Sequence, residues 1–361
     1  MTTPLQRIRR DIQGMHAYAI QDAAGLVKLD AMENPHPLPE ALQAALGERL
    51  GRVAINRYPG PRVGDLKQAL ADHIDLPPGC DLMLGNGSDE LIALLALACD
   101  VPGASVLAPV PGFVMYAMSA QLQGLAFHGV SLTPDFELDE PAMLAAIQTH
   151  RPAITYLAYP NNPTANLWDA GVIRRLIAAA AGVGGLVVID EAYQPFASHT
   201  WLSEMRADPA ANAHVLLMRT LSKFGLAGVR LGYMVGTQSL VHEIDKVRPP
   251  YNISALNAEC ALFALEHAQV FADQAADICR EREALLTALA LVPGVQAFPS
   301  QANMVLVRVP DADKSFAGMK AAGVLIKNVS KMHPLLARCL RLTVGTAAEN
   351  ARMLAALSAN L

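Results

Sequence analysis

The chain reads Leu186-Val187-Val188-Ile189-Asp190 in the most apolar of its short aliphatic runs. A run of consecutive aliphatic residues, without alternation, is typical of a strand that is buried on both faces. Further runs of this kind, separated by alanine-rich helical stretches, occur at residues 81–84, 105–108, 153–157, 214–218 and 231–235. Such strands alternating with helices predict an α/β fold, with a mostly parallel sheet that helices cover on both faces.

The C-terminal part of the chain has a different pattern. Residues 257–291 are typical of one or two long helices, and the last helix is expected from Ala348. Short apolar runs lie between them at 304–307, 324–326 and 339–344. This α+β pattern predicts a second, smaller domain. We expect an N-terminal arm that forms part of the small domain at 1–50, a large domain at 51–270 and the small C-terminal domain at 271–361.

The composition excludes several classes of function. The chain has 361 residues, 52% of them hydrophobic, a net charge of −5, and no basic run that could follow a nucleic-acid backbone. Apolar runs such as 91–99 are too short to span a bilayer. The five cysteines are scattered and lack the spacing of metal ligands. We therefore expect a reduced, cytoplasmic protein with no metal site, no membrane segment and no nucleic-acid partner.

One lysine stands among phosphate-binding residue types directly after the run at 214–218. The stretch 220–230 reads TLSKFGLAGVR, so Lys223 has Thr220 and Ser222 before it and Arg230 after it. Two hydroxyls and a guanidinium are typical phosphate ligands. An amine beside a phosphate is what a Schiff-base lysine holding pyridoxal 5′-phosphate requires. The alternative interpretation is a solvated loop with one stray lysine.

A second phosphate-like motif follows the run at 81–84. Residues 85–90 read GNGSDE before an apolar helix, so Ser88 or Asp89 is expected to cap that helix. The free N–H groups and the dipole at a helix N-terminus favour an anion. A plain capped turn is the alternative, and the second phosphate-like site favours phosphate binding.

Polar and aromatic residues follow the other predicted strands. Asp190 ends its strand, where ligands of parallel sheets bind, and would pair with the pyridine nitrogen of the cofactor. At an effective dielectric constant near 20, such an ion pair at about 3 Å contributes roughly 5 kcal/mol before desolvation. Tyr193 and Asn162 would hydrogen-bond the phenolic oxygen of the ring, and Phe113 would stack on the ring. Taken singly, Asp190 fits a carboxylate that caps the next element equally well, Asn162 is typical of a turn, and core packing is the default role of Phe113.

Together these segments resemble the fold type I, pyridoxal-phosphate-dependent aminotransferases, and within them the histidinol-phosphate aminotransferases. The resemblance extends from about residue 29 to the C-terminus. The segments that carry it are LDAMENP at 29–35, RYP at 57–59, GNGSDE at 85–90, VIDEAY at 188–193, RTLSK at 219–223 and CLRLTVG at 339–345.

The resemblance implies a role for each of these residues. Lys223 would form the Schiff base and move a proton between the substrate and the cofactor, while Asp190, Asn162 and Tyr193 would bind the ring. The cofactor phosphate would be held by Thr220, Ser222, Arg230 and the amides of Ser88 and Asp89. The resemblance also implies a homodimer, in which Tyr58 reaches the phosphate bound by the partner subunit.

For the substrates, the resemblance implies that Arg341 binds the glutamate α-carboxylate and, in the other half-reaction, the phosphate of histidinol phosphate. Lys327 stands where relatives have an arginine that helps to bind the substrate phosphate, and Tyr18 would line the substrate pocket. Two further departures concern the backbone. Arg230 follows Lys223 by only seven residues, and Ala165 stands where glycine is usual and would be strained at a positive φ.

The function implied is a transamination between L-histidinol phosphate and 2-oxoglutarate, which gives imidazole acetol phosphate and glutamate in histidine biosynthesis. Two alternatives stay open: a lyase similar to threonine-phosphate decarboxylase, and an aminotransferase for aromatic amino acids. A regulator that uses this fold as an effector sensor would need an added DNA-binding domain, whereas only about 30 residues precede the family-like segment.

Overall fold

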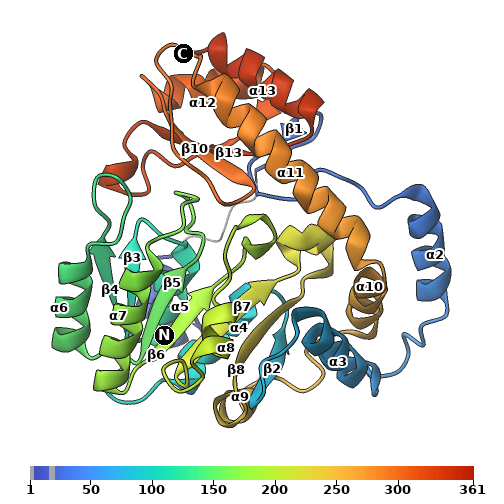
Figure 1. Ribbon diagram of the computed structural model, residues 1–361, viewed down its shortest axis with the longest axis vertical. Helices are drawn as coiled ribbons and strands as arrows, with labels where there is room; N and C mark the ends of the chain where they lie inside the picture. Colours follow the sequence, from blue (N-terminus) through green and yellow to red (C-terminus); the bar gives the residue numbers. More distant parts are fainter. Residues whose placement is uncertain (1–3, 16–20) are drawn as a thin grey trace.

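The structure is a computed structural model, which describes residues 4–15 and 21–361. A central sheet with helices around it forms the larger part, and a smaller part made mainly from residues 268–361 lies over it (Figure 1). In spatial order the sheet contains β2 (Cys80–Gly85), β8 (Gly232–Thr237), β7 (Val215–Thr220), β6 (Leu186–Asp190), β5 (Ile154–Ala158), β3 (Ser105–Val110) and β4 (Ala126–Ser131). β8 runs opposite to the other strands, so its pairings with β2 and β7 are antiparallel, and all the other pairings in this sheet are parallel. The predicted α/β fold with a mostly parallel sheet is confirmed.

Helices cover both faces of this sheet. They are α3 (Arg62–Ile74), α4 (Ser88–Ala98), α5 (Val114–Gln123), α6 (Glu140–His150), α7 (Ala170–Val183), α8 (Leu202–Ala207), α9 (Gln238–Asp245) and α10 (Ala255–Glu266). Along β6, Val187 and Ile189 join one hydrophobic core with α6 and α7, whereas Val188 joins a second core with α4 and α5. Successive side chains of a strand point to opposite faces, so burial of both faces explains why this run lacks alternation.

One strand of the sheet has no counterpart among the predicted runs. β4 lies at the edge of the sheet and pairs only with β3. Its residues are exposed or half-buried, and its sequence AFHGVS has no continuous apolar run. An edge strand that is partly solvated carries no strong hydrophobic pattern, which is why the sequence analysis missed it.

The C-terminal part has a sheet of its own. Its strands are ordered β12 (Lys327–Asn328), β13 (Cys339–Thr343), β10 (Met304–Arg308) and β9 (Gln296–Ala297), and all neighbours pair antiparallel. The helices α11 (Ala268–Leu289), α12 (Ala312–Ala321) and α13 (Ala347–Ser358) pack around a separate hydrophobic core, and a short 3-10 turn, η5 (Pro334–Leu336), precedes β13. The expected α+β pattern is therefore present.

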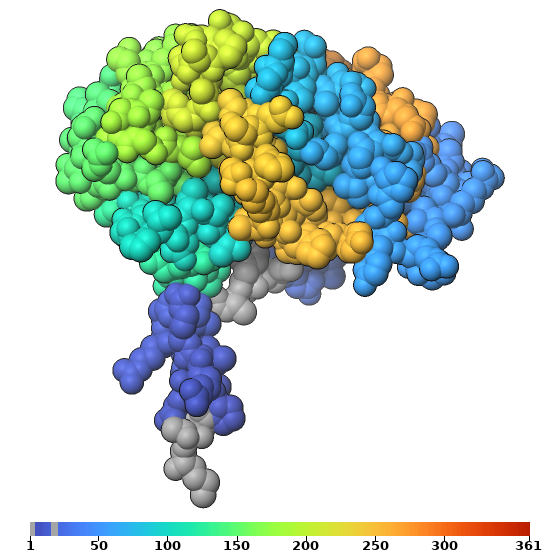
Figure 2. All heavy atoms as spheres, turned by 90° about the horizontal axis from the view of Figure 1, so that it is seen from below, coloured from blue at the N-terminus to red at the C-terminus, as the bar shows by residue number. Residues whose placement is uncertain are grey.

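The N-terminal region contacts both parts of the molecule. β1 (Val27–Lys28) pairs in parallel with β11 (Val324–Leu325) of the C-terminal part, whereas α2 (Glu40–Gly51) lies against α10. Residues 4–14 form η1 (Pro4–Arg7) and α1 (Arg10–Gln13) and project away from the body (Figure 2). The boundaries of the domains stay a prediction. Among the helices of the described residues, none has both the length and the hydropathy of a membrane span.

A carboxylate on α10 joins the outer helices α2 and α3 to the body. Glu259 accepts hydrogen bonds from Arg49 Nε at 2.8 Å and from Arg62 Nη2 at 2.9 Å. The bonds from Arg62 lower the pKa of Glu259 to about 2, against the effect of its partial burial. A depressed pKa stabilises the folded state above the ordinary pKa of a glutamate, and this contribution disappears as the pH falls towards 2.

We therefore expect Glu259→Gln to lower the free energy of unfolding by about 1 kcal/mol at pH 7, since the arginines are partly exposed. The difference in the free energy of unfolding between this variant and the unchanged protein should become smaller as the pH falls from 4.5 to 2. Urea denaturation at fixed protein concentration and several pH values measures this. Glu243→Gln, which breaks the exposed pair with Lys246, is the control and should have a smaller effect. Equal losses for the two variants would contradict this role of Glu259.

Candidate active site

A cavity lies at the carboxyl ends of the parallel strands, where ligands of such sheets bind. Its lining includes every residue that the sequence analysis assigned to the cofactor except Tyr58, namely Ser88, Asp89, Phe113, Asn162, Asp190, Tyr193, Thr220, Ser222, Lys223 and Arg230. Met32 and Tyr116, which the sequence analysis did not single out, also line it. Arg341 and Lys327 are not lining residues, and Tyr18 lies outside the described residues. The roles of these residues stay predictions.

One end of the cavity contains the start of α4. The helix begins at Ser88 after Gly87, whose φ is +79°, and neither Ser88 nor Asp89 caps it as predicted, because Gly87 is the N-cap residue and no side chain bonds the first turn. A Cβ atom on Gly232 would lie 2.9 Å from the Ser88 nitrogen. The backbone thus approaches β8 closely, and the amides of the first turn stay available to an anion.

Hydroxyl and guanidinium groups lie at the same end. Thr220 Oγ1 is 3.0 Å from Ser222 Oγ, and Arg230 Nη1 donates to Ser222 Oγ at 3.3 Å. Between Lys223 and Arg230 the chain forms a π-helical turn, η3 (Ser222–Leu226), and a 3-10 turn, η4 (Ala227–Val229). Arg230 itself adopts a φ of +56°. Despite the short spacing, Arg230 lines the cavity.

Lys223 is the only lysine among the lining residues. Its Nζ donates to the carbonyl oxygen of Ala31 at 2.8 Å. Burial, assisted by the positive charge of Arg341, lowers the pKa of the Lys223 amine to about 8. At neutral pH, the neutral fraction of this amine is therefore larger than that of an ordinary surface lysine. The neutral amine is the nucleophilic form.

Asp190 is almost fully buried at the end of β6, and a donor contacts each of its carboxylate oxygens. Tyr116 Oη donates to Oδ2 at 2.6 Å, and the backbone N–H of Ala192 donates to Oδ1 at 3.1 Å. Burial raises the pKa of Asp190 to about 6, while these two bonds act in the opposite direction. Phe113 and Tyr116 are three residues apart, a spacing that brings side chains together on a helix and would have been the only sequence signal for Tyr116.

Arg341 lies behind the cavity and contacts one of its lining residues. Its Nη1 donates to Asn162 Oδ1 at 2.8 Å, and its Nη2 donates to the carbonyl oxygen of Asp30 at 2.8 Å. Lys327 is directly opposite Arg341 in the pairing of β12 with β13. Side chains of directly paired residues point to the same face of a sheet, so Lys327 and Arg341 lie on the same face of this sheet.

The chain was compared with known proteins. Residues 24–357 match the family model of the class I and II aminotransferases. Curated histidinol-phosphate aminotransferases from Polaromonas naphthalenivorans and Paracidovorax citrulli are 70% and 68% identical to it, over 98% and 100% of this chain and 96% and 99% of theirs. This chain belongs to the histidinol-phosphate aminotransferase family. The family resemblance predicted from the motifs is therefore confirmed.

The fold agrees with solved structures of the histidinol-phosphate aminotransferase family. The structure of the enzyme from Sinorhizobium meliloti, in complex with pyridoxal-5′-phosphate, superposes with a TM-score of 0.83 at 24% identity and covers 98% of this chain and 97% of its own. At this identity the likeness shows the fold alone.

In this member of the histidinol-phosphate aminotransferase family, Ala165 adopts the conformation that would strain it. Its φ is +64° and its side chain is fully buried. The left-handed region disfavours residues with a Cβ atom, although a tight hydrogen-bond frame can hold one there. Ala165 N donates to Asn161 O at 2.8 Å, and Ala165 O accepts from Gln301 N at 2.7 Å.

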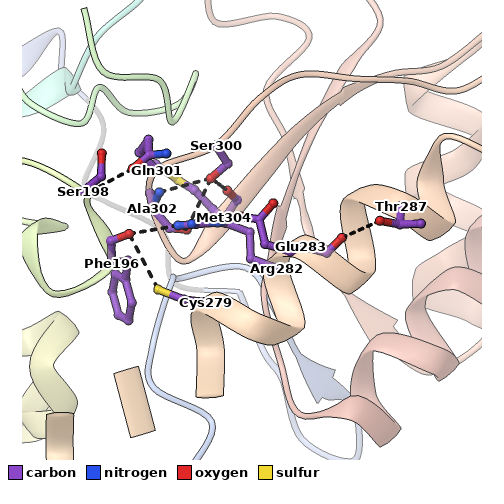
Figure 3. Close-up of polar contacts among 10 residues, drawn as sticks. All are labelled: Phe196, Ser198, Cys279, Arg282, Glu283, Thr287, Ser300, Gln301, Ala302 and Met304. Carbon is purple, nitrogen blue, oxygen red and sulfur yellow. Dashed lines mark hydrogen bonds and ion pairs between the residues drawn. The ribbon is translucent and has the colours of Figure 1, made fainter. Parts of the chain in front are cut away.

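A buried arginine joins the segment after Tyr193 to the C-terminal part (Figure 3). Arg282, on α11, donates from Nη1 to the carbonyl oxygens of Phe196, at 3.0 Å, and Ala302, at 3.3 Å. The side chain of Gln301 accepts from the Ser198 N–H at 2.9 Å. Phe196 closes the turn η2 (Gln194–Phe196) that follows Tyr193. In this histidinol-phosphate aminotransferase family member, these bonds hold the segment that follows Tyr193 against the C-terminal part.

Proposed function

We propose that this protein transfers an amino group between L-histidinol phosphate and 2-oxoglutarate, giving imidazole acetol phosphate and glutamate in histidine biosynthesis. The observation that carries the proposal is the cavity, in which Lys223 and Asp190 lie together with the anion-binding groups at the start of α4. The full-length identity of about two thirds with curated histidinol-phosphate aminotransferases supports the choice of substrate.

The lining residues fit pyridoxal 5′-phosphate. The glycine-permitted approach of Gly232 to the first turn of α4, together with Thr220, Ser222 and Arg230, suits a phosphate dianion. Asp190 supplies a carboxylate for a protonated ring nitrogen. Asn162 and Tyr193 supply hydrogen-bonding groups for the phenolic oxygen, and Phe113 supplies an aromatic face.

When bound, the cofactor supplies an electron-withdrawing ring that stabilises negative charge at the α-carbon of the substrate. The residues of the chain perform the other tasks. Lys223, whose pKa is lowered, would attach the cofactor and would then move a proton between the α-carbon of the substrate and the C4′ atom of the cofactor. Asp190 keeps the ring nitrogen protonated, and Arg230 with the amides of α4 orients the ring through its phosphate.

Arg341 is proposed to bind the anionic groups of both substrates. One substrate is a phosphomonoester and the other a dicarboxylate, and a guanidinium pairs with either anion. Lys327 lies opposite it and adds a second positive charge, without the fork of an arginine.

We expect Arg341→Ala to raise the KM for 2-oxoglutarate and for histidinol phosphate, each by roughly 10- to 100-fold, the range for a hydrogen bond to a charged group. Steady-state kinetics with each substrate varied in turn measures this. Arg352→Ala, which removes an exposed arginine on α13, should leave both KM values unchanged. An increase for only one of the substrates would contradict the shared anion site.

A visible absorption spectrum tests the function itself. Addition of histidinol phosphate should convert the aldehyde form of the bound cofactor into the amine form, and 2-oxoglutarate should reverse the change. Release of carbon dioxide without 2-oxoglutarate would instead indicate a decarboxylase. Turnover of aromatic amino acids far faster than that of histidinol phosphate would indicate the other aminotransferase.

We also propose a homodimer in the cytoplasm. Tyr58 is 77% exposed, stacks on Tyr251 with ring centroids 4.5 Å apart, and does not line the cavity of its own chain. An exposed tyrosine pair of this kind suits an interface, through which Tyr58 would reach the phosphate bound by the partner subunit. All five cysteines are free, as a reducing compartment requires. Sedimentation of a monomer that is fully active would contradict the dimer.

A further inference from the structure

The hydroxyl of Tyr116 is committed to the carboxylate at the floor of the cavity. Tyr116 lies on α5 and is 2% exposed, and its Oη donates to Asp190 Oδ2 at 2.6 Å. The other oxygen, Oδ1, accepts from the backbone of Ala192. With a donor on each oxygen, the plane of the Asp190 carboxylate is determined by the protein alone.

Stacked rings determine the position of the tyrosine. The ring of Tyr116 lies parallel to that of Tyr156 on β5, with centroids 4.3 Å apart and an angle of 6° between the planes. The ring of Phe113, which lines the cavity, packs edge-to-face with the ring of Tyr116, and their centroids are 5.6 Å apart. Tyr116 and Tyr156 both belong to the hydrophobic core beneath α4 and α5. This packing leaves the Tyr116 hydroxyl little freedom other than its bond to Asp190.

Apart from the bonds from Tyr116 and Ala192, the largest influences on Asp190 oppose its negative charge. Burial is the largest influence that raises its pKa, and the carboxylates Asp89 on α4 and Glu191 next in the chain act in the same direction. Arg219 of β7 pairs with Glu191 at 2.8 Å. The buried hydroxyls of Tyr116, Tyr156 and Tyr193 also interact with Asp190, and of these three only Tyr116 bonds it. The cations Lys223 and Arg230 line the same cavity. The bond from Tyr116 therefore carries much of the stabilisation of the ionised form.

We propose that Tyr116 is a positioning residue, which orients the Asp190 carboxylate and holds it ionised for the ring nitrogen of the bound cofactor. The proposal rests on the proposed function, since it needs pyridoxal 5′-phosphate in this cavity. Tyr116 acts through Asp190. It therefore affects how the apoenzyme binds the cofactor before any substrate is present.

The test compares two tyrosines that are stacked on each other. Tyr116→Phe removes the hydroxyl that bonds Asp190. Tyr156→Phe removes a buried hydroxyl that has no hydrogen-bond partner among the described residues, and Tyr156 does not line the cavity. The dissociation constant of pyridoxal 5′-phosphate from each apoenzyme is measured by titration between pH 5 and pH 8, together with thermal melting.

For Tyr116→Phe we expect the ratio of its dissociation constant to that of the unchanged protein to rise about tenfold as the pH falls from 8 to 5. This follows from a shift of about one pH unit in the protonation of Asp190, and titrations of the free cofactor cancel in the ratio. For Tyr156→Phe the ratio should stay constant. A ratio for Tyr116→Phe that does not depend on pH, or the same rise in both variants, would overturn the proposal.

Two further variants separate the hydrogen bond from packing. In an Asp190→Asn background, Tyr116→Phe should cause no additional pH-dependent loss. Replacement of Tyr116 by 4-aminophenylalanine keeps a hydrogen-bond donor on the ring, so the ratio of dissociation constants should again be independent of pH. The same variant tests the proposal if the phenylalanine variant does not fold. If the phenylalanine variant loses affinity for pyridoxal 5′-phosphate and 4-aminophenylalanine does not restore it, Tyr116 contributes to packing only. Failure of the unchanged apoenzyme to bind pyridoxal 5′-phosphate would contradict the proposed function instead.

Discussion

We expect the Lys223→Ala variant to lose its covalent attachment to pyridoxal 5′-phosphate and to turn over histidinol phosphate at least roughly 10³-fold more slowly, as befits loss of a nucleophile that is also the general base. The phosphate-binding groups at the start of α4 remain, so the variant should still hold the cofactor noncovalently. Borohydride reduction followed by peptide mass spectrometry measures the attachment, and steady-state kinetics measures the turnover.

Lys246→Ala provides the control, because Lys246 is exposed on the surface and pairs with Glu243. That variant should keep both the modified peptide and the turnover of the unchanged protein. Modification of a lysine other than Lys223 in the unchanged protein would refute the assignment, and so would substantial turnover by the alanine variant.

The lowered pKa of Lys223 predicts how cofactor attachment depends on pH. The neutral amine is the nucleophile, and its fraction increases up to and beyond the pKa of about 8. The rate of attachment to the apoenzyme should rise about tenfold from pH 6 to pH 7 and level off above pH 9. Arg341 is the second cause of the lowered pKa, so Arg341→Ala should move the midpoint to higher pH. A midpoint near that of a solvated lysine would contradict this reading, and stopped-flow absorbance measures it.

The second large effect concerns Asp190. Asp190→Asn would remove the proposed ion pair with the ring nitrogen, which contributes roughly 5 kcal/mol before desolvation, so turnover should fall by roughly three orders of magnitude. The amide has nearly the same shape as the carboxylate, and thermal stability should change little. Single-turnover kinetics with histidinol phosphate measures the chemical step apart from binding.

Asp277→Asn, which alters an exposed carboxylate on α11, is the matched control and should react at the rate of the unchanged protein. If Asp190→Asn kept more than a tenth of the single-turnover rate, the ring nitrogen would not need this carboxylate. The assignment of the cofactor orientation in the cavity would then be wrong.

The cavity residues were predictable from the sequence because their chemistry is local. Lys223, Ser222 and Thr220 lie within a stretch of four residues, and Asp190 ends a strand whose burial its composition predicts. Carboxyl ends of parallel strands meet at one edge of a sheet, so residues that follow different strands converge there. This rule needs only the order of strands and helices, which the hydrophobic pattern provides.

Other features depend on contacts between distant segments. Tyr116 bonds Asp190 across 74 positions of the chain, and no spacing rule predicts such a bond. The exposed edge strand β4 carries no apolar signal. The amide partners of Ala165 come from Asn161 and from Gln301, and only this frame explains how an alanine keeps a left-handed backbone.

The order of buried strands, the family and the presence of Lys223 in the cavity can be predicted from the amino-acid sequence, since hydrophobic burial and side-chain chemistry are properties of short segments. The tilt of the Asp190 carboxylate, the lowered pKa of Lys223 and the approach of Arg341 to Asn162 cannot. These arise from burial and from the charges of residues that only folding brings within hydrogen-bonding distance.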